Sequence, residues 1–170
     1  TSWVSPKIIW VNQGHLWNMC QCQECEAVRN TEGSDSANWV MLANSIAVQV
    51  AGKYPDVFIG TFAYLHTEAP PKTVRPRNNV LIYQLPHTQN GLGPVPTYSF
   101  QANAMTKWAS MAKMYVWEYD ANYRNYYQPH PNYFVSGHNI KFFKEIGVDG
   151  VMVQSSFGKA ADLTAMRTWV

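Results

Sequence analysis

Five short runs of aliphatic, β-branched and aromatic residues constrain the fold of this chain more than any other feature of its sequence. Most of them are almost continuously apolar instead of alternating between apolar and polar residues. This pattern is typical of strands that are covered on both faces in a parallel sheet. The five expected strands are Ile8 to Gln13, Val57 to Tyr64, Val80 to Leu85, Met114 to Tyr119 and Val151 to Ser155.

Helical signals lie between most of these runs. A helix is expected to follow an N-cap at Ser34, Asp35 or Ser36, and another is expected to begin near Asp162. Apolar stripes with helical spacing indicate the helices, and the two tryptophans on them are expected in the core. The stripes are Trp39, Ala43, Ile46 and Val50, then Met105, Trp108, Ala109 and Ala112, then Ile140, Phe143 and Ile146.

The connection between Tyr64 and Val80 differs from the others because it contains three prolines and no helical period. This composition indicates an extended crossing segment between two strands. Taken together, the elements predict an α/β fold, a partial (β/α)8 TIM-type barrel with about five parallel strands and flanking helices. An open doubly wound sheet is the alternative.

Five strands cannot close an eight-stranded barrel, so the sheet is expected to keep open edges. Residues 1–170 are therefore expected to form a single domain, the C-terminal portion of a larger barrel. Its open side is expected to contact a missing barrel segment or another copy of the chain.

The composition narrows the range of partners. The net charge is +2 without a run of Lys or Arg, which argues against nucleic acid and anionic membranes as partners. No apolar stretch approaches the roughly 20 residues needed to span a bilayer. Only 14% of the residues are charged, whereas ten are Tyr and seven are Trp. This balance suits a secreted, extracellular protein that handles sugars, whose export signal was removed or lies further upstream.

Several phrases spread along the chain resemble one family. In their order and spacing they are similar to the domain of unknown function 4838 (DUF4838), a family of barrel proteins related to α-glucuronidases and other glycoside hydrolases. The resemblance implies a secreted, carbohydrate-active barrel of which this chain forms the later strands. The phrases are MCQCQEC (19–25), TEGSDS (31–36), YPDVFIGTFAYLHTEAPP (54–71), RPRNNV (75–80), YVWEYDANY (115–123), PHPN (129–132) and NIKFFKEIGVDGVMVQ (139–154).

Two positions depart from the family pattern. His15 stands where an acidic residue is common shortly before the cysteines, and Val153 stands where Glu is common before Gln154. If those acids serve catalysis in the family, their replacement argues against hydrolysis by this chain.

Three acidic residues are candidates for glycosidic bond cleavage, which usually needs two carboxyl groups flanking the bond. Glu118 lies near the C-terminal end of its expected strand, where barrel enzymes place their chemistry. Glu68 or Asp120 is the candidate for the second group. The alternative is that Glu118 only holds a hydrogen-bond network with Asn122, Arg124 or Gln154.

Aromatic and planar polar side chains near the strand ends are candidates for sugar binding. The apolar face of a pyranose stacks on aromatic rings, and its hydroxyls form hydrogen bonds with polar groups. The loop after Tyr119 either contributes to this site or shields the mouth of the barrel. The candidates are Trp117, Tyr119, Asn122, Tyr123, Tyr126, Gln154, Tyr64 and His66.

Cys20, Cys22 and Cys25 form a cluster in the sequence, with His15 upstream. In an oxidising compartment two of the three are expected to form a disulfide, and the third could pair with another part of the protein or another subunit. A zinc site and free thiols are the alternatives. No nucleotide-binding, serine hydrolase or zinc peptidase motif occurs, and we expect no cofactor.

Two hypotheses of function follow. The first is a glycoside-hydrolase-like enzyme that binds and cleaves polysaccharide. The second is a non-catalytic domain that kept the barrel and serves as a sugar-binding or structural subunit of an extracellular assembly.

Overall fold

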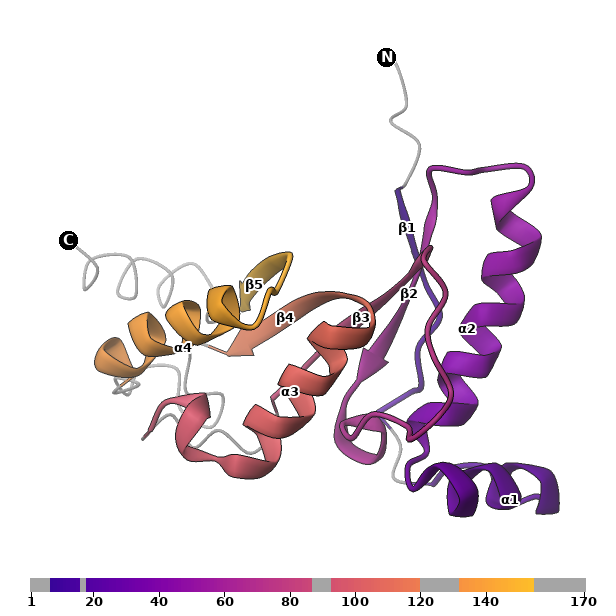
Figure 1. The fold of residues 1–170 in the computed structure, drawn as a ribbon, viewed down its shortest axis with the longest axis horizontal. Coiled ribbons are helices and arrows are strands. Elements are labelled where there is room, and N and C mark those ends of the chain that lie inside the picture. The colour runs from indigo at the N-terminus through magenta and orange to yellow at the C-terminus, as the bar shows by residue number, and fades with distance from the viewer. Residues whose placement is uncertain (1–6, 16–17, 87–92, 120–131, 155–170) are drawn as a thin grey trace.

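The computed structural model describes residues 7–15, 18–86, 93–119 and 132–154 of the chain. Within these residues, five strands form one parallel sheet in the order β1-β2-β3-β4-β5, which confirms the expected strands (Figure 1). The strands are β1 (Ile8–Trp10), β2 (Phe58–Ala63), β3 (Val80–Gln84), β4 (Lys113–Tyr119) and β5 (Gly150–Gln154).

Four α-helices accompany the sheet in the described residues. They are α1 (Gln23–Glu32), α2 (Ser36–Ala51), α3 (Ser99–Met111) and α4 (Tyr133–Glu145), and two 3-10 turns occur at η1 (Leu65–Thr67) and η2 (Val95–Thr97). The helix expected near Asp162 lies outside the described residues. Among those residues, no helix combines the length and the apolarity required to cross a membrane.

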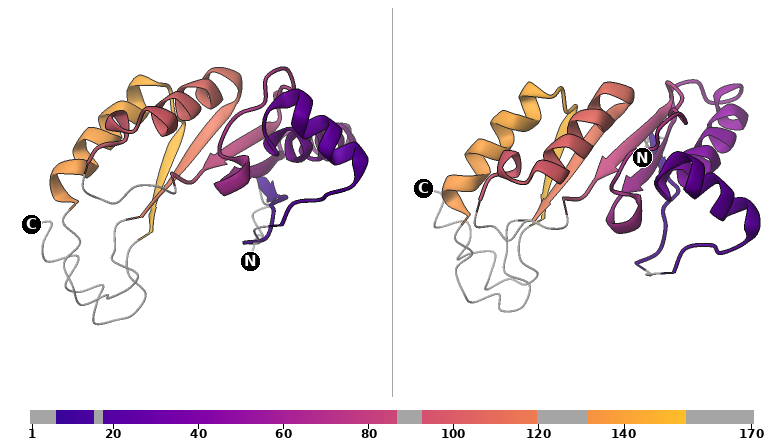
Figure 2. Two further views of the ribbon diagram at one scale, coloured as in Figure 1. Left: turned by 90° about the horizontal axis from the view of Figure 1, so that it is seen from below. Right: turned by 60° about the horizontal axis from the view of Figure 1, so that its bottom comes forward.

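The sheet curls into a half-barrel with the helices on its outer side (Figure 2). Each strand pairs with its neighbour in sequence and runs parallel to it, as in the consecutive strands of a TIM-type barrel. The predicted α/β fold with a partial barrel is therefore confirmed.

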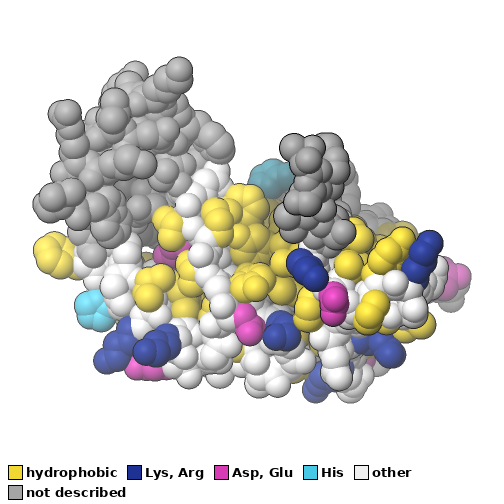
Figure 3. All heavy atoms as spheres, turned by 90° about the horizontal axis from the view of Figure 1, so that it is seen from above, with side chains coloured by type: hydrophobic (Ala, Val, Ile, Leu, Met, Phe, Trp, Pro, Cys, Tyr) yellow, Lys and Arg dark blue, Asp and Glu magenta, His cyan; other side chains and the backbone are white. Residues whose placement is uncertain are grey.

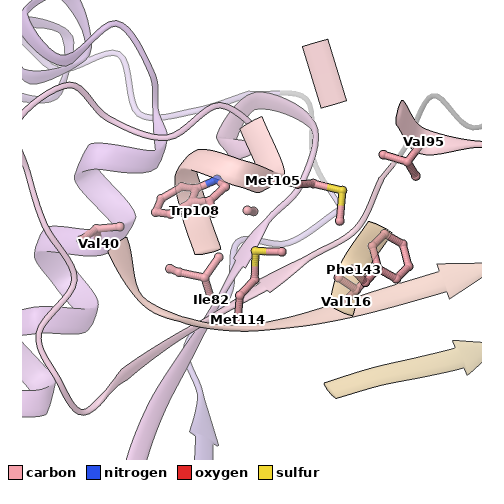
Figure 4. Close-up of a cluster of buried hydrophobic side chains, with 9 residues drawn as sticks. Val40, Ile82, Val95, Met105, Trp108, Met114, Val116 and Phe143 are labelled. Carbon is pink, nitrogen blue, oxygen red and sulfur yellow. The ribbon is translucent and has the colours of Figure 1, made fainter. Parts of the chain in front are cut away.

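The core lies between the sheet and its helices (Figure 4). Alternate residues of the central strands point toward the helices, where Ile82 of β3 and Met114 and Val116 of β4 pack against Trp108 of α3 and Phe143 of α4. All five side chains are almost fully buried. Burial of Trp108 confirms its expected place in the core, whereas Trp39 is partly exposed.

The segment between β2 and β3 is extended apart from the turn η1, as the prolines predicted. The corner between α1 and α2 holds it in place. The hydroxyls of Ser34 and Ser36 each donate to the carbonyl oxygen of Ala69 at 2.7 Å. The Glu32 carboxylate accepts hydrogen bonds from the backbone N–H of Thr73 at 2.7 Å and of Val74 at 3.1 Å.

One helix was missed, and two local expectations were wrong. Helix α1 was not predicted, because its sequence QECEAVRNTE has no apolar stripe. Ile140 lies on the outer side of α4 with 47% of its surface exposed, although it was placed on a core stripe. The strand β1 ends at Trp10 instead of Gln13.

Candidate functional site

A row of aromatic side chains crosses the face of the sheet that is turned away from the helices, which we call the inner face. The alternation of residues along each strand brings them to this face, because their neighbours in sequence point into the helix-facing core. The row consists of Trp10, Phe62, Tyr83, Tyr115, Trp117 and Tyr119. Hydrophobic side chains also gather at the centre of the molecule in the space-filling view from above (Figure 3).

The rings of this row are in contact from strand to strand. The ring centroids of Trp10 and Tyr83 lie 5.1 Å apart and are stacked, and those of Tyr83 and Trp117 lie 5.7 Å apart. Phe62 meets Trp117 edge-on at 6.1 Å, and Tyr119 continues the row from Trp117 at 6.1 Å. None of these residues is fully buried. The inner face therefore presents a nearly continuous aromatic surface.

Two glycines make room for this surface. A Cβ atom added to Gly60 of β2 would lie 2.3 Å from the six-membered ring of Trp10. A Cβ atom added to Gly150 of β5 would lie 2.6 Å from the ring of Tyr115. Any side chain at either position would displace the ring that covers it.

Polar groups surround the C-terminal end of the inner face. The indole N–H of Trp117 donates to Oε1 of Gln154 on β5 at 2.7 Å, which fixes the orientation of the ring. The ring of His15 stacks on that of Tyr64, and its Nδ1 lies 3.3 Å from the phenol oxygen. Gln13 holds this corner, because its amide donates to the carbonyl oxygen of Tyr64 at 2.9 Å.

The phenols at this end remain protonated at neutral pH. Burial raises the pKa of Tyr64, and the nearby phenol of Tyr119 adds to that effect. Burial likewise raises the pKa of Tyr119.

Glu118 points to the opposite side of the sheet from Trp117 and Tyr119. Its side chain shares a face with Met114 and Val116 and is 6% exposed. The side-chain amide of Asn139 in α4 donates to Oε1 of Glu118 at 2.7 Å, and Oδ1 of Asn139 accepts from the backbone N–H of Val95 at 2.8 Å. The carboxylate thus connects β4 to α4.

Glu68 lies directly after η1 and is 5% exposed. Burial raises the pKa of its carboxyl group to about 7. Its Oε1 atom accepts no hydrogen bond from the described residues, whereas its carbonyl oxygen accepts one from the indole of Trp108 at 2.8 Å. Glu68 is therefore a carboxyl group that can hold a proton at neutral pH.

The structure brings together part of the predicted set. Trp117, Tyr119, Tyr64 and Gln154 meet at the C-terminal end of the inner face, and His66 is exposed in η1. Asp120, Asn122, Tyr123 and Tyr126 lie outside the described residues. Sequence reasoning missed Trp10, Phe62, Tyr83 and Tyr115 as members of the aromatic face. Phe62 lies two residues before Tyr64 and Tyr115 two residues before Trp117, and this spacing was the available signal for those two.

The cysteine cluster lies at the start of α1. Cys22 is the N-cap residue, and its Sγ accepts a hydrogen bond from the backbone N–H of Cys25 at 3.5 Å. Hydrogen bonds from the backbone of Cys22, and then from the Cys22 and Cys25 side chains, lower the pKa of Cys20. Hydrogen bonding to Cys22 and Cys20, together with burial, raises the pKa of Cys25 to about 12. The predicted disulfide stays a prediction.

Fold and site together define a class of protein, a parallel α/β half-barrel whose inner face is aromatic and whose helix-facing side contains the buried carboxylate of Glu118. Residues 5–170 match the family described as Domain of unknown function (DUF4838), and the chain belongs to that family. Searches of curated proteins and of solved structures found no match.

Proposed function

We propose that this domain binds extracellular carbohydrate on the inner face of its half-barrel. The observation that carries the proposal is the row of touching, partly exposed aromatic rings that ends among polar groups at the C-terminal end of the strands. In barrel proteins this end of the sheet is where ligands bind.

The physical chemistry of the face suits a sugar. Pyranose rings carry C–H groups on one face, which stack on indole and phenol rings, and hydroxyls at their edges, which need hydrogen-bond partners. Trp117 is held in one orientation by Gln154, so little side-chain entropy is lost when a ligand stacks on it. Tyr64 and His66 would supply hydrogen bonds at the edge of the ligand.

Three further residues belong to the proposal on sequence grounds. Asn122, Tyr123 and Tyr126 follow β4 directly in the sequence. Their side-chain types are those that form hydrogen bonds to sugars or stack on them.

Binding is tested by titrating the purified protein with a panel of oligosaccharides in a calorimeter. Trp117→Ala should weaken the binding of any sugar that binds the wild type at least about five-fold, because losing an aromatic ring on which a ligand stacks costs about 1 to 3 kcal/mol for nucleobases, and a sugar is expected to be similar. Phe100→Ala is the matched control, since Phe100 is an aromatic residue of α3 that is 56% exposed on the helix side. Equal affinity of all three proteins, or no binding of any sugar, would contradict the proposal.

Glycosidic bond hydrolysis is the second candidate function. The observation that favours it is the burial of the Glu68 carboxyl group, whose Oε1 accepts no hydrogen bond from the described residues. Burial raises its pKa to about 7, and a general acid must hold its proton near neutral pH. Glu118 and Asp120 are the sequence candidates for the partner group, and Asp120 is the better one, because the Glu118 carboxylate is enclosed on the helix-facing side, where it accepts from Asn139.

Hydrolysis is tested by the release of reducing ends from a sugar that binds. Glu68→Gln should reduce turnover at least 100-fold with little change in binding, and Glu118→Gln or Asp120→Asn identifies the second group. Binding without turnover in the wild-type protein would exclude hydrolysis of that sugar and leave the binding proposal intact.

A further inference from the structure

Three thiol groups converge at one point on the surface beside the sheet. The Sγ atoms of Cys20, Cys22 and Cys25 all lie within 4.8 Å of one another. A tetrahedral zinc ion with Zn–S bonds of ~2.3 Å holds its sulfur ligands about 3.8 Å apart. The three sulfurs therefore need to approach one another by no more than about 1 Å to bind one ion.

Side chains of α1 and α2 hold the backbone around the cluster. Arg29 of α1 donates from Nη2 to the carbonyl oxygen of Cys20 at 3.0 Å, and its Nε forms an ion pair with Asp35. Asn38 of α2 donates to the carbonyl oxygen of Cys25 at 3.1 Å. These contacts fix both ends of the C-x-C-x2-C segment, so the thiols are placed by the fold and not only by their proximity in sequence.

The N-terminus of α1 suits a negatively charged sulfur at Cys22. The cluster lies at the N-terminus of a helix of 10 residues, where the exposed N–H groups favour anions, and one of these N–H groups already points at Sγ of Cys22. Two of the three cysteines are exposed and the third is partly exposed, so an ion reaches them from solvent.

We propose that Cys20, Cys22 and Cys25 bind one zinc ion through three thiolates. Binding replaces the three thiol protons, which are released to solvent, and leaves a fourth coordination position. A cavity of about 390 Å³ adjoins Cys20 and Cys25 and is also lined by Gln13, Asp35 and Trp39, which leaves space for water or another small ligand at that position. Three soft sulfur donors select zinc over magnesium or calcium, which prefer oxygen.

The test uses the reduced protein after removal of metals with a chelator. Titration with Co²⁺ should give sulfur-to-cobalt charge-transfer absorption that saturates at one equivalent and is abolished by Zn²⁺. Cys20→Ser, Cys22→Ser and Cys25→Ser should each weaken cobalt binding at least ten-fold. Glu26→Gln, in the first turn of α1, is the control that should bind as the wild type does.

A second measurement needs no variant. Zn²⁺ should protect all three cysteines of the wild-type protein from alkylation, as counted by mass spectrometry. The proposal is overturned if the reduced protein gives no charge-transfer absorption, or if zinc leaves all three thiols open to alkylation. It is also overturned if the protein as purified contains a disulfide between two of the cysteines and, once reduced, does not bind cobalt.

Discussion

The two faces of the sheet are built from the same five strands and differ in almost every other respect. The helix-facing side buries aliphatic side chains with Trp108 and Phe143, and its polar groups, such as Glu118, are enclosed with them. The inner face carries aromatic rings that stay partly exposed. One face therefore packs against the helices, and the other keeps its aromatic rings partly exposed.

This difference also separates the side chains of β4. Trp117 and Tyr119 lie on the inner face, whereas Glu118 between them reaches α4 through Asn139. Residues next to each other in β4 thus have different surroundings, because successive side chains of a strand point to opposite faces of the sheet. We expect substitutions on the two faces to have different effects.

The largest effect is expected from removing the indole ring on the helix-facing side. Trp108→Ala should lower the free energy of unfolding by about 3 to 5 kcal/mol, because it leaves a cavity and removes the hydrogen bond to the carbonyl oxygen of Glu68. Trp117→Ala, the same substitution on the inner face, should cost roughly 1 to 2 kcal/mol because that ring is partly exposed. Denaturant unfolding measures both. Equal losses would contradict the division between the faces.

The next effect concerns the pH dependence of stability. Folded Glu68 keeps its proton up to about pH 7, whereas the ordinary value for a free Glu is 4.5. Between these values the folded protein binds more protons than the unfolded chain, so stability falls as the pH rises. Glu68→Gln should remove this fall, which amounts to roughly 2 to 3 kcal/mol between pH 4.5 and 7.

Unfolding of the wild type and of Glu68→Gln at a series of pH values measures the difference. Glu145→Gln, at the exposed end of α4, is the control and should follow the wild type. If Glu68→Gln follows the wild type as well, the carboxyl group of Glu68 is ionised in the folded protein at acidic pH and is no general acid.

The smallest effect is expected on the inner face. Gly60→Ala should cost about 1 to 2 kcal/mol and change the tryptophan fluorescence, because the new methyl group displaces the ring of Trp10. Gly137→Ala in α4 is the matched control, since nothing lies within 4 Å of its added Cβ, and it should leave stability unchanged or raise it by up to ~1 kcal/mol. An unchanged Trp10 environment in Gly60→Ala would show that the aromatic surface is loosely packed.

Much of the fold could be predicted from the sequence because buried parallel strands leave a clear pattern. The apolar runs around Ile82 and Val116 predicted β3 and β4, and the prolines after Tyr64 predicted the extended connection between β2 and β3. Helix α1 was missed because its ends are defined by capping residues, and its sequence has no apolar stripe. Cys22 starts it, and Gly33 ends it in the left-handed conformation at φ 74°.

The site was harder to predict because burial on the two faces depends on contacts between distant segments. Successive side chains of β4 point to opposite faces of the sheet. Glu118 could therefore have been assigned to the face of Met114 and Val116. Nothing local shows that α4 brings Asn139 to that carboxylate, 21 residues further along the chain. The aromatic row was equally hidden, because its rings come from four separate strands.

The consecutive order of the strands has a consequence for how the chain folds. Within the part of the chain that the structure describes, every strand pairs only with its neighbours in sequence, and the connection between β2 and β3 is shorter than those between the other pairs. Closing a shorter loop costs less entropy, so we expect the pairing of β2 with β3 to form first and the sheet to grow outward from it. The outer strands β1 and β5, each with one neighbour among the described strands, then join last and open first, and hydrogen exchange should be fastest there.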